Sequence, residues 1–243
     1  MKRIFTILIL GLFIIECNYG QDFKKIDYQI DFGVSLTIPY KKTIEIWPDI
    51  ENHPKTDYGS NLGYYLEFLI SYNFKKKYAI NSGLYYKYTS IKINDKIGYI
   101  ENKGNLTSSY LNLPILIKYR FSNKIPVSIS AGPYLGFMIR ANEKGTSYID
   151  TAGFTFEEPD PIIQTIEPIQ TYDKDIKKDY TLIDFGLSVK IDYDFRLSKQ
   201  LTGIILTRFD YGLKDVMTND LVNNNIASNW KNYNILLGLG IRL

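Results

Sequence analysis

The chain has 243 residues, of which 45% are hydrophobic and 23% are charged, and its aromatic residues are 21 Tyr, 13 Phe and 2 Trp. This composition excludes a disordered chain, a collagen-like repeat and a disulfide scaffold. The formal net charge is +3, which is too balanced for the one-signed field that nucleic-acid binding requires, so nucleic-acid partners are excluded. The one cysteine, Cys17, lies in the leader described next. We therefore expect a mature chain without a thiol for a disulfide, a zinc site or a nucleophile.

The first 20 residues have the pattern of a secretory signal. Lys2 and Arg3 precede an apolar run from Ile4 to Ile15, and Gly20 stands just before a plausible cleavage site. The run is shorter than the roughly 20 residues that a membrane-spanning helix needs, so a retained anchor is the weaker alternative. A lipoprotein signal has a small residue directly before the lipidated cysteine, whereas Glu16 precedes Cys17 here, so lipid attachment is the weaker alternative. The sequence predicts a signal peptide at 1–20 and one mature domain at 21–243.

The mature chain shows repeated two-residue alternation of apolar and polar residues and no convincing helical stripe. Between 180 and 197, for example, Val189 and Ile191 alternate with Lys190 and Asp192. This pattern predicts an all-β fold. The predicted strands, in chain order, are 28–41, 62–74, 78–93, 109–121, 126–141, 180–197, 200–213 and 231–243.

The predicted connections alternate in length. Tight polar turns are expected at 75–77, 122–125 and 198–199, and long polar connections at 42–61, 94–108, 142–179 and 214–230. An up-and-down barrel with short turns at one rim and long loops at the other has this arrangement. The sequence therefore predicts a single eight-stranded antiparallel up-and-down transmembrane β-barrel, with short periplasmic turns and long extracellular loops.

The alternation alone fits a soluble barrel as well as a membrane barrel. The apolar parity, however, holds too many large side chains for the interior of eight strands, while the polar parity is rich in glycine, which suits a crowded lumen. We therefore expect the apolar face to meet lipid and the protein to reside in the outer membrane after export. Tyr and Phe near the strand ends fit aromatic girdles.

The inward parity would carry a nearly balanced set of acids and bases. Because unpaired charges in a narrow lumen are costly, we favour a paired network that plugs the barrel. A selective channel or proton path is the functional alternative. The predicted network consists of Asp31, Glu67, Lys87, Lys118, Arg120, Arg140, Asp184, Lys190, Asp192, Asp194, Arg196, Arg208, Asp210 and Arg242.

Three short stretches resemble the PorT-type outer-membrane β-barrel family of Bacteroidota. They are Leu111–Phe121 (LNLPILIKYRF), Ala131–Phe137 (AGPYLGF) and Phe209–Asp215 (FDYGLKD). The closing Tyr233–Leu243 is similar to an outer-membrane terminal strand. The chain departs from the terminal-strand pattern by ending in Leu243 rather than an aromatic residue. The resemblance implies a barrel in the outer membrane. The namesake of the family is implicated in protein secretion, and many members have no assigned role.

Few residues suggest catalysis or metal binding. His53 is the only histidine, and no partner for general-base or ligand chemistry is placed near it, so we read it as a solvated loop residue. The acidic stretch Glu157–Asp160 could hold a divalent cation, but a solvated charge run is the better interpretation. We expect no enzyme activity, no cofactor and no metal site.

The sequence thus predicts a non-enzymatic outer-membrane barrel that acts as a scaffold, an accessory subunit or a surface-binding protein. Its partners are expected to be outer-membrane lipid and a protein at the extracellular loops. The connection 142–179 is the best candidate because it mixes acidic, aromatic and apolar residues. A narrow porin-like channel and a component of a secretion system are the alternatives.

Overall fold

The structure is a computed structural model that describes residues 25–39, 43–45, 55–98, 100–121, 125–150, 166–198, 201–215 and 231–243. The predicted signal peptide lies outside these residues. No helix in the described ranges is long and apolar enough to cross a membrane. The elements are β1 (Ile26–Pro39), β2 (Thr43–Glu45), β3 (Lys55–Lys75), β4 (Tyr78–Ile97), β5 (Ile100–Arg120), β6 (Val127–Asp150), β7 (Ile166–Asp175), the short 3-10 helix η3 (Lys177–Asp179), β8 (Ile183–Arg196), β9 (Thr202–Gly212) and β10 (Asn232–Arg242).

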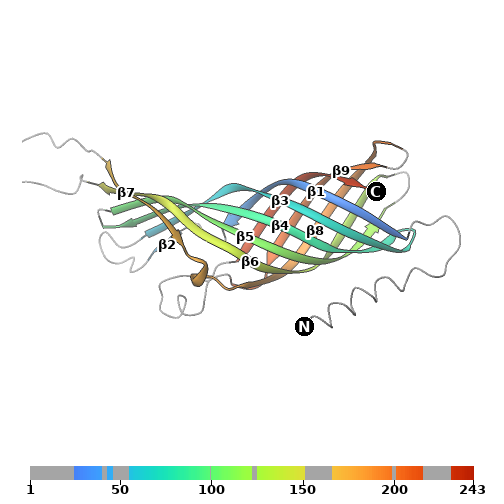
Figure 1. Cartoon of the computed structure of the whole chain (residues 1–243), viewed down its shortest axis with the longest axis horizontal. Coiled ribbons are helices and arrows are strands. Elements are labelled where there is room, and N and C mark those ends of the chain that lie inside the picture. The colour runs from blue at the N-terminus through green and yellow to red at the C-terminus, as the bar shows by residue number, and fades with distance from the viewer. Residues whose placement is uncertain are drawn as a thin grey trace, which may run out of the picture.

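Eight of the strands form a closed antiparallel ring, as Figure 1 shows. The order β1-β10-β9-β8-β6-β5-β4-β3 is closed by pairing of β1 with β3, from Ile26 opposite Tyr72 to Thr37 opposite Asn61. Two further strands lie off the ring, β2 beside β3 and β7 beside β6. The predicted all-β, eight-stranded antiparallel barrel is therefore confirmed.

Successive residues of each ring strand point to opposite faces, as the alternation predicts. In β8, Val189 and Ile191 are 40% and 43% exposed on the outside, whereas Lys190 and Asp192 are fully buried inside. The same parity places large apolar side chains on the outside of all eight ring strands. A continuous apolar exterior around a polar interior is the arrangement of a barrel whose solvent is lipid.

Aromatic pairs lie at both ends of the apolar wall. Phe74 stacks on Tyr78 beside the β3–β4 turn, with ring centroids 6.1 Å apart. At the other end, Tyr211 stacks on Tyr233 at 4.8 Å and Tyr64 on Tyr88 at 4.9 Å. Such belts are typical of the two membrane interfaces, where an amphipathic ring meets both lipid tails and water.

The start of β1 and the end of β10 lie at the same end of the barrel, here called the terminal end; the opposite end is called the distal end. Leu243 donates its backbone N–H to Tyr28 O at 2.9 Å, so β10 finishes beside the start of β1. The predicted tight turn at 75–77 lies at this end, where β3 stops at Lys75 and β4 starts at Tyr78. The predicted turns at 122–125 and 198–199 lie partly outside the described residues. Figure 1 shows this terminal end on the right, opposite β2 and β7.

The prediction of loops at 94–108 is wrong, and that of loops at 42–61 and 142–179 is wrong for much of their length. The first is the end of β4 and the start of β5, joined by a tight turn in which Gly98 adopts φ +59. A left-handed residue of this kind is nearly always glycine, because a Cβ would be strained. The other two contain β2, the start of β3, the end of β6 and all of β7. Of 214–230, only 214 and 215 are described.

These extra strand segments form a sheet that continues past the ring, here called the distal extension. It consists of residues 55–60 of β3, 89–97 of β4, 100–109 of β5, 140–150 of β6 and all of β7, while β1 and β8–β10 stop short of it. Its inner face holds a small apolar core, closed by Tyr180 from the segment that follows η3. The core residues are Ile91, Ile93, Leu106, Tyr110, Met138, Ala141 and Tyr180, with Tyr58 and Ile176 packed against them.

Glycines on the inner wall make room for inward tyrosines. A Cβ on Gly238 would lie 2.0 Å from the Tyr65 hydroxyl, and one on Gly186 would lie 2.7 Å from the Tyr134 ring. Both distances are far below van der Waals contact, so a side chain at either position would displace the tyrosine. The inward glycines are therefore part of how the lumen is filled.

Candidate functional site

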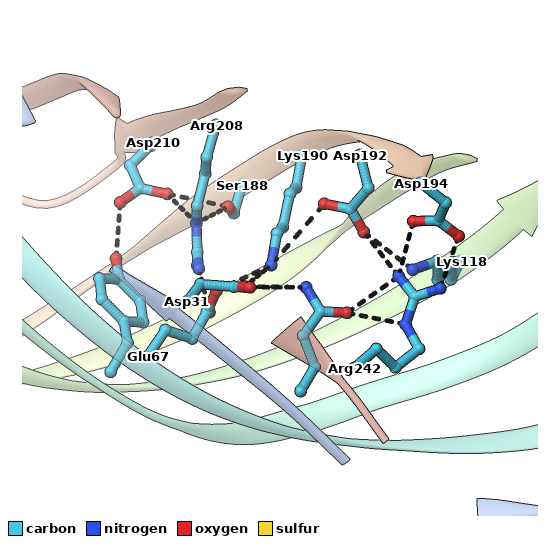
Figure 2. Close-up of polar contacts among 12 residues, drawn as sticks. Asp31, Glu67, Lys118, Ser188, Lys190, Asp192, Asp194, Arg208, Asp210 and Arg242 are labelled. Atoms are coloured by element: carbon cyan, nitrogen blue, oxygen red, sulfur yellow. Dashed lines mark hydrogen bonds and ion pairs between the residues drawn. The ribbon is translucent and has the colours of Figure 1, made fainter. Parts of the chain in front are cut away.

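The lumen holds a chain of buried charged side chains that runs along the barrel, as Figure 2 shows. The predicted residues that lie on the inner wall come from seven of the ring strands. Positive and negative side chains alternate along the series of ion pairs that they form. The predicted residues that lie on the inner face are Asp31, Glu67, Lys87, Lys118, Arg120, Asp184, Lys190, Asp192, Asp194, Arg208, Asp210 and Arg242.

Glu67 is at the centre of this chain. It accepts a hydrogen bond from Lys190 Nζ at 2.9 Å and a second one from the Arg208 guanidinium. Lys190 also donates to Asp31. These side chains come from β1, β3, β8 and β9, on opposite sides of the ring, and all four are almost completely buried. The cluster therefore ties both halves of the wall together across the lumen.

The chain continues toward the distal end through Asp210. Arg208 Nε donates to Asp210 Oδ1 at 2.9 Å, and Lys87 Nζ lies 3.5 Å from Asp210 Oδ2. The Tyr85 hydroxyl donates to the same carboxylate at 2.5 Å, and the Tyr85 ring lies 4.1 Å from the Arg208 guanidinium carbon. Every charge in this group therefore faces an opposite charge, a hydroxyl or a ring face.

Toward the terminal end, the chain passes to Asp192 and then to Arg242. Lys118 Nζ donates to Asp192 Oδ2 at 2.8 Å, and an Arg242 nitrogen lies 3.7 Å from the same oxygen. Arg242 forms a two-nitrogen pair with Asp194, at 2.6 Å and 3.1 Å, and donates to Gln29 Oε1. The last link, at the rim, is a 3.2 Å bond from Arg120 to Asp27 (the charged residue that opens β1).

Asp184 lies apart from the bases. Among the described residues, no Lys or Arg nitrogen lies within 4.0 Å of its carboxylate, which accepts from Tyr134 at 3.3 Å and from Asn232 at 3.2 Å. Tyr110 in turn accepts a 3.3 Å bond from Asn232. This group forms a polar layer between the charged chain and the apolar core of the distal extension.

Two predicted lumen residues do not lie in the lumen. Ser109 is opposite Arg140, but Tyr110 is opposite Met138, so Ile139 is an extra residue in β6. Such a β-bulge reverses the facing of the residues beyond it, and Arg140 therefore lies on the outer surface. Arg196 has the inward parity but lies at the end of β8, exposed at the rim, and donates to Ser198 O at 3.3 Å.

Several inward residues were missing from the predicted network, although they share its parity. Asp27 precedes the predicted start of the first strand, and the inward tyrosines carry no charge, so neither belongs to the predicted set of charged residues. The signal that could have found them is the inward parity itself, read for every polar or aromatic residue. The most important are Asp27, Gln29, Tyr65, Tyr85, Tyr110, Tyr134 and Asn232.

The distal extension has acidic groups on its inner face. Burial raises the pKa of Asp95 and of Glu143 above their ordinary values. A hydrogen bond with Thr56 lowers the pKa of Asp95 in part, and one from Tyr172 does so for Glu143, whose pKa the charge of Asp95 raises further. The Tyr172 hydroxyl lies over Gly104 and Gly145, where a Cβ would come within 3.0 Å and 2.6 Å of it. These groups make the inner face of the extension partly polar and sensitive to pH.

No group of three or more His, Cys, Asp or Glu side chains in the described ranges is placed to hold a metal ion. His53 and the acidic stretch Glu157–Asp160 lie outside those ranges. What the lumen can do chemically follows from its pairing: apart from Asp184, the buried charges of the network lie beside opposite charges, so the ion pairs can join the strands and obstruct the passage.

Comparison with known proteins agrees with the barrel. The family model described as outer membrane protein beta-barrel domain matches residues 20–218, and this match places the protein in the outer membrane. No curated protein matches the sequence.

Solved structures with a similar chain course include three from other bacteria. Ail, the attachment invasion locus protein of Yersinia pestis, solved with the heparin analogue sucrose octasulfate, is 13% identical; the match covers 90% of this chain and 100% of Ail, with a TM-score of 0.38. OprG from Pseudomonas aeruginosa is 12% identical, with 90% and 97% coverage and a TM-score of 0.42. Neisserial surface protein A is 14% identical, with 90% and 97% coverage and a TM-score of 0.38. Since the family model spans most of the sequence, the chain belongs to the outer membrane protein beta-barrel domain family.

Proposed function

We propose that the protein is a non-enzymatic barrel with a closed lumen that presents the distal extension at the cell surface as a binding platform for a protein partner. The observation that carries this proposal is the continuation of four ring strands beyond the ring, joined there by β7, with an apolar core on the inner face. Strand pairing and a packed core give a rigid surface, and a rigid surface loses little conformational entropy on binding.

The lumen supports the closed state. Glu67, Lys190 and Arg208 meet at its centre, and Tyr65, Tyr85 and Tyr134 add large rings to the same inner wall. An eight-stranded barrel has an interior just wide enough for side chains to fill. A filled interior leaves the surface as the place for specific recognition.

The hairpin of β6 and β7 is the most favourable part of the platform. It holds nine paired positions, from Asn142 opposite Asp175 to Asp150 opposite Ile166. It also falls within 142–179, the stretch whose mixture of acidic, aromatic and apolar residues suggested a binding role. The proposal therefore keeps the predicted location and replaces a free loop by a β-hairpin.

The test is to shorten this hairpin without removing its base. Residues 147–170 are deleted and joined by a two-residue turn, so that the pair Thr146–Thr171 and the pairs below it remain. We expect unchanged outer-membrane insertion and heat-dependent gel mobility, because the ring is untouched. Tagged wild-type protein, extracted in mild detergent, should retain a partner that the deletion protein loses; equal retention by both would contradict the proposal.

A narrow channel is the second candidate. Polar side chains in the terminal half of the lumen, Ser71, Asn81, Ser128 and Ser130, have atoms without a hydrogen-bond partner in the described part of the chain. Buried polar atoms of this kind are generally hydrated, and hydration favours passage of small solutes. Planar-bilayer conductance separates this candidate from the closed barrel.

A role in a secretion complex is supported only by the resemblance of the stretches around Leu111–Phe121 and Ala131–Phe137 to the PorT-type family. The same pull-down addresses it, because a complex subunit would carry its neighbours through mild extraction. A partner held in the periplasm would survive the hairpin deletion, whereas a partner at the cell surface would not.

A further inference from the structure

A groove of about 460 Å³ lies on the outer wall, at the level where the ring passes into the distal extension. On β3 and β4 its lining includes Tyr64 and Tyr88, the stacked rings at the end of the lipid-facing surface. On β6 and β7 its lining includes the outward residues Arg140, Lys144 and Asp173. The groove therefore joins an aromatic belt to a polar surface that carries two bases.

Arg140 is at this place because of the bulge in β6. Its Nε donates to Asn142 Oδ1 at 2.9 Å, and Asn142 Nδ2 donates to Asp173 Oδ1 at 3.2 Å. Among the described residues, the two terminal nitrogens of Arg140 have no hydrogen-bond partner, and no carboxylate lies within 4.0 Å of the guanidinium. The side chain is thus held at one nitrogen while the other two remain available as a two-pronged donor.

Lys144 adds a second positive charge. Its Nζ lies 3.9 Å from Asp173 Oδ2, and both side chains are more than half exposed, so the pair is weak. Asn61 and Asn105 line the groove as well and are joined by a 3.2 Å side-chain bond. The lining therefore offers a guanidinium fork, an ammonium group and amides, which suit a phosphate attached to a sugar.

The position of the groove identifies the molecule that meets it. In an outer-membrane barrel, the end opposite the termini faces the outside, and the aromatic belt marks the level of the headgroups. At that level the outer leaflet of a Gram-negative bacterium presents lipid A, a glycolipid that carries phosphate on its sugars. We propose that the groove binds a phosphate of lipid A, with Arg140 as its main ligand and Lys144 as a second cation. This site is independent of the surface-binding role proposed above.

The experiment measures lipid A binding to the full-length mature protein in detergent, by native mass spectrometry of titrated samples. Wild type is compared with R140Q and with R196Q, a matched control at the opposite rim. We expect R140Q to weaken binding of bis-phosphorylated lipid A about tenfold or more, the usual effect of losing charge-assisted bonds. R196Q should bind as wild type does, and dephosphorylated lipid A should bind wild type and R140Q equally weakly.

K144Q gives a second reading from a separate side chain, with a smaller loss expected because Asp173 already neutralises part of its charge. Heat-dependent gel mobility shows that each variant is folded. Equal binding of bis-phosphorylated lipid A by wild type, R140Q and K144Q would overturn the proposal. So would equal binding of phosphorylated and dephosphorylated lipid A by wild type. Displacement of lipid A by inorganic phosphate at matching concentration would show a site for free phosphate and would overturn the assignment to a lipid.

Discussion

Lys190 is the residue on which the pairing in the lumen depends most. It bonds Asp31 and Glu67, its Nζ lies 3.8 Å from Asp192 Oδ1, and all four side chains are almost completely buried. Three acids therefore lie around one base, and among the described residues Lys190 is the only base within 4.0 Å of Asp31. Removing that base leaves carboxylates from three strands close together in a poorly hydrated interior, which is strongly unfavourable.

We predict that Lys190→Met lowers the free energy of unfolding by about 3–5 kcal/mol, as expected when one partner of a buried ion pair is lost. Urea-induced unfolding in phospholipid vesicles measures the change. Val189→Ala, the neighbouring substitution on the lipid-facing wall, is the matched control and should cost far less because it leaves no buried charge unpaired. A loss for Lys190→Met no larger than that of the control would mean that the chain of ion pairs does not hold the barrel together.

The inward position of most charged residues could be predicted from the sequence. Lys190 and Asp192 alternate with Val189 and Ile191, so their facing follows from strand geometry once the apolar face is assigned to lipid. Arg140 could not be placed in this way. One extra residue at Ile139 reverses the facing beyond it, and a bulge leaves no reliable mark in a single sequence. The outward position of Arg140 in the groove, and with it the proposed binding of lipid A, is a consequence of that bulge.

Among the elements, the distal extension was the part that the sequence did not predict. Alternation arises where one face of a strand meets lipid and the other meets the lumen, and this contrast ends at the membrane surface. Beyond it both faces of β5 and β6 carry polar residues, as in Lys103 beside Asn102 and Lys144 beside Glu143, and the apolar core on the inner face is small. A strand with polar residues on both faces reads as a loop, so the sequence pattern does not reveal the strands within 94–108 or those at 142–150 and 166–175.

The extension is also where pH dependence is expected. Burial raises the pKa of Asp95 and of Glu143 in the folded protein above their ordinary values of 3.8 and 4.5. The folded extension therefore binds more protons than the unfolded one in the range above those values, and its stability falls as pH rises through the raised pKa values. The predicted stability of the extension is highest in acid.

Amide hydrogen exchange measures this effect locally. We expect peptides from 89–97 and 140–148 to be more protected at about pH 5 than at about pH 8, after correction for the intrinsic exchange rate. Asp95→Asn should reduce the difference, whereas Asp57→Asn, at a carboxylate that is 45% exposed on the same sheet, should leave it unchanged. Equal protection at both pH values in the wild type would contradict the assigned burial of the two acids.

For the whole molecule, strand number, chain order and facing followed from the sequence, because a barrel in lipid imposes one period on every strand. β1 closes the ring by pairing with both β3 and β10. The sequence predicts this closure, because an even number of strands brings both ends of the ring to one side of the membrane. The sequence does not show whether the lumen is open. The alternation places a charged side chain inside the barrel, but it does not show which opposite charge lies beside it. The pairs from Lys87–Asp210 to Arg242–Asp194 support the proposed closed lumen.

The central claim, that the barrel is closed and acts through its surface, is tested most directly by the conductance of the purified wild-type protein in a planar lipid bilayer. Insertion is checked separately by heat-dependent gel mobility of the same sample. We predict no discrete openings above the bare bilayer, because the paired charges and inward tyrosines fill the eight-stranded lumen. Stable, stepwise, ohmic conductance from folded wild-type protein would contradict the account and would favour the narrow channel.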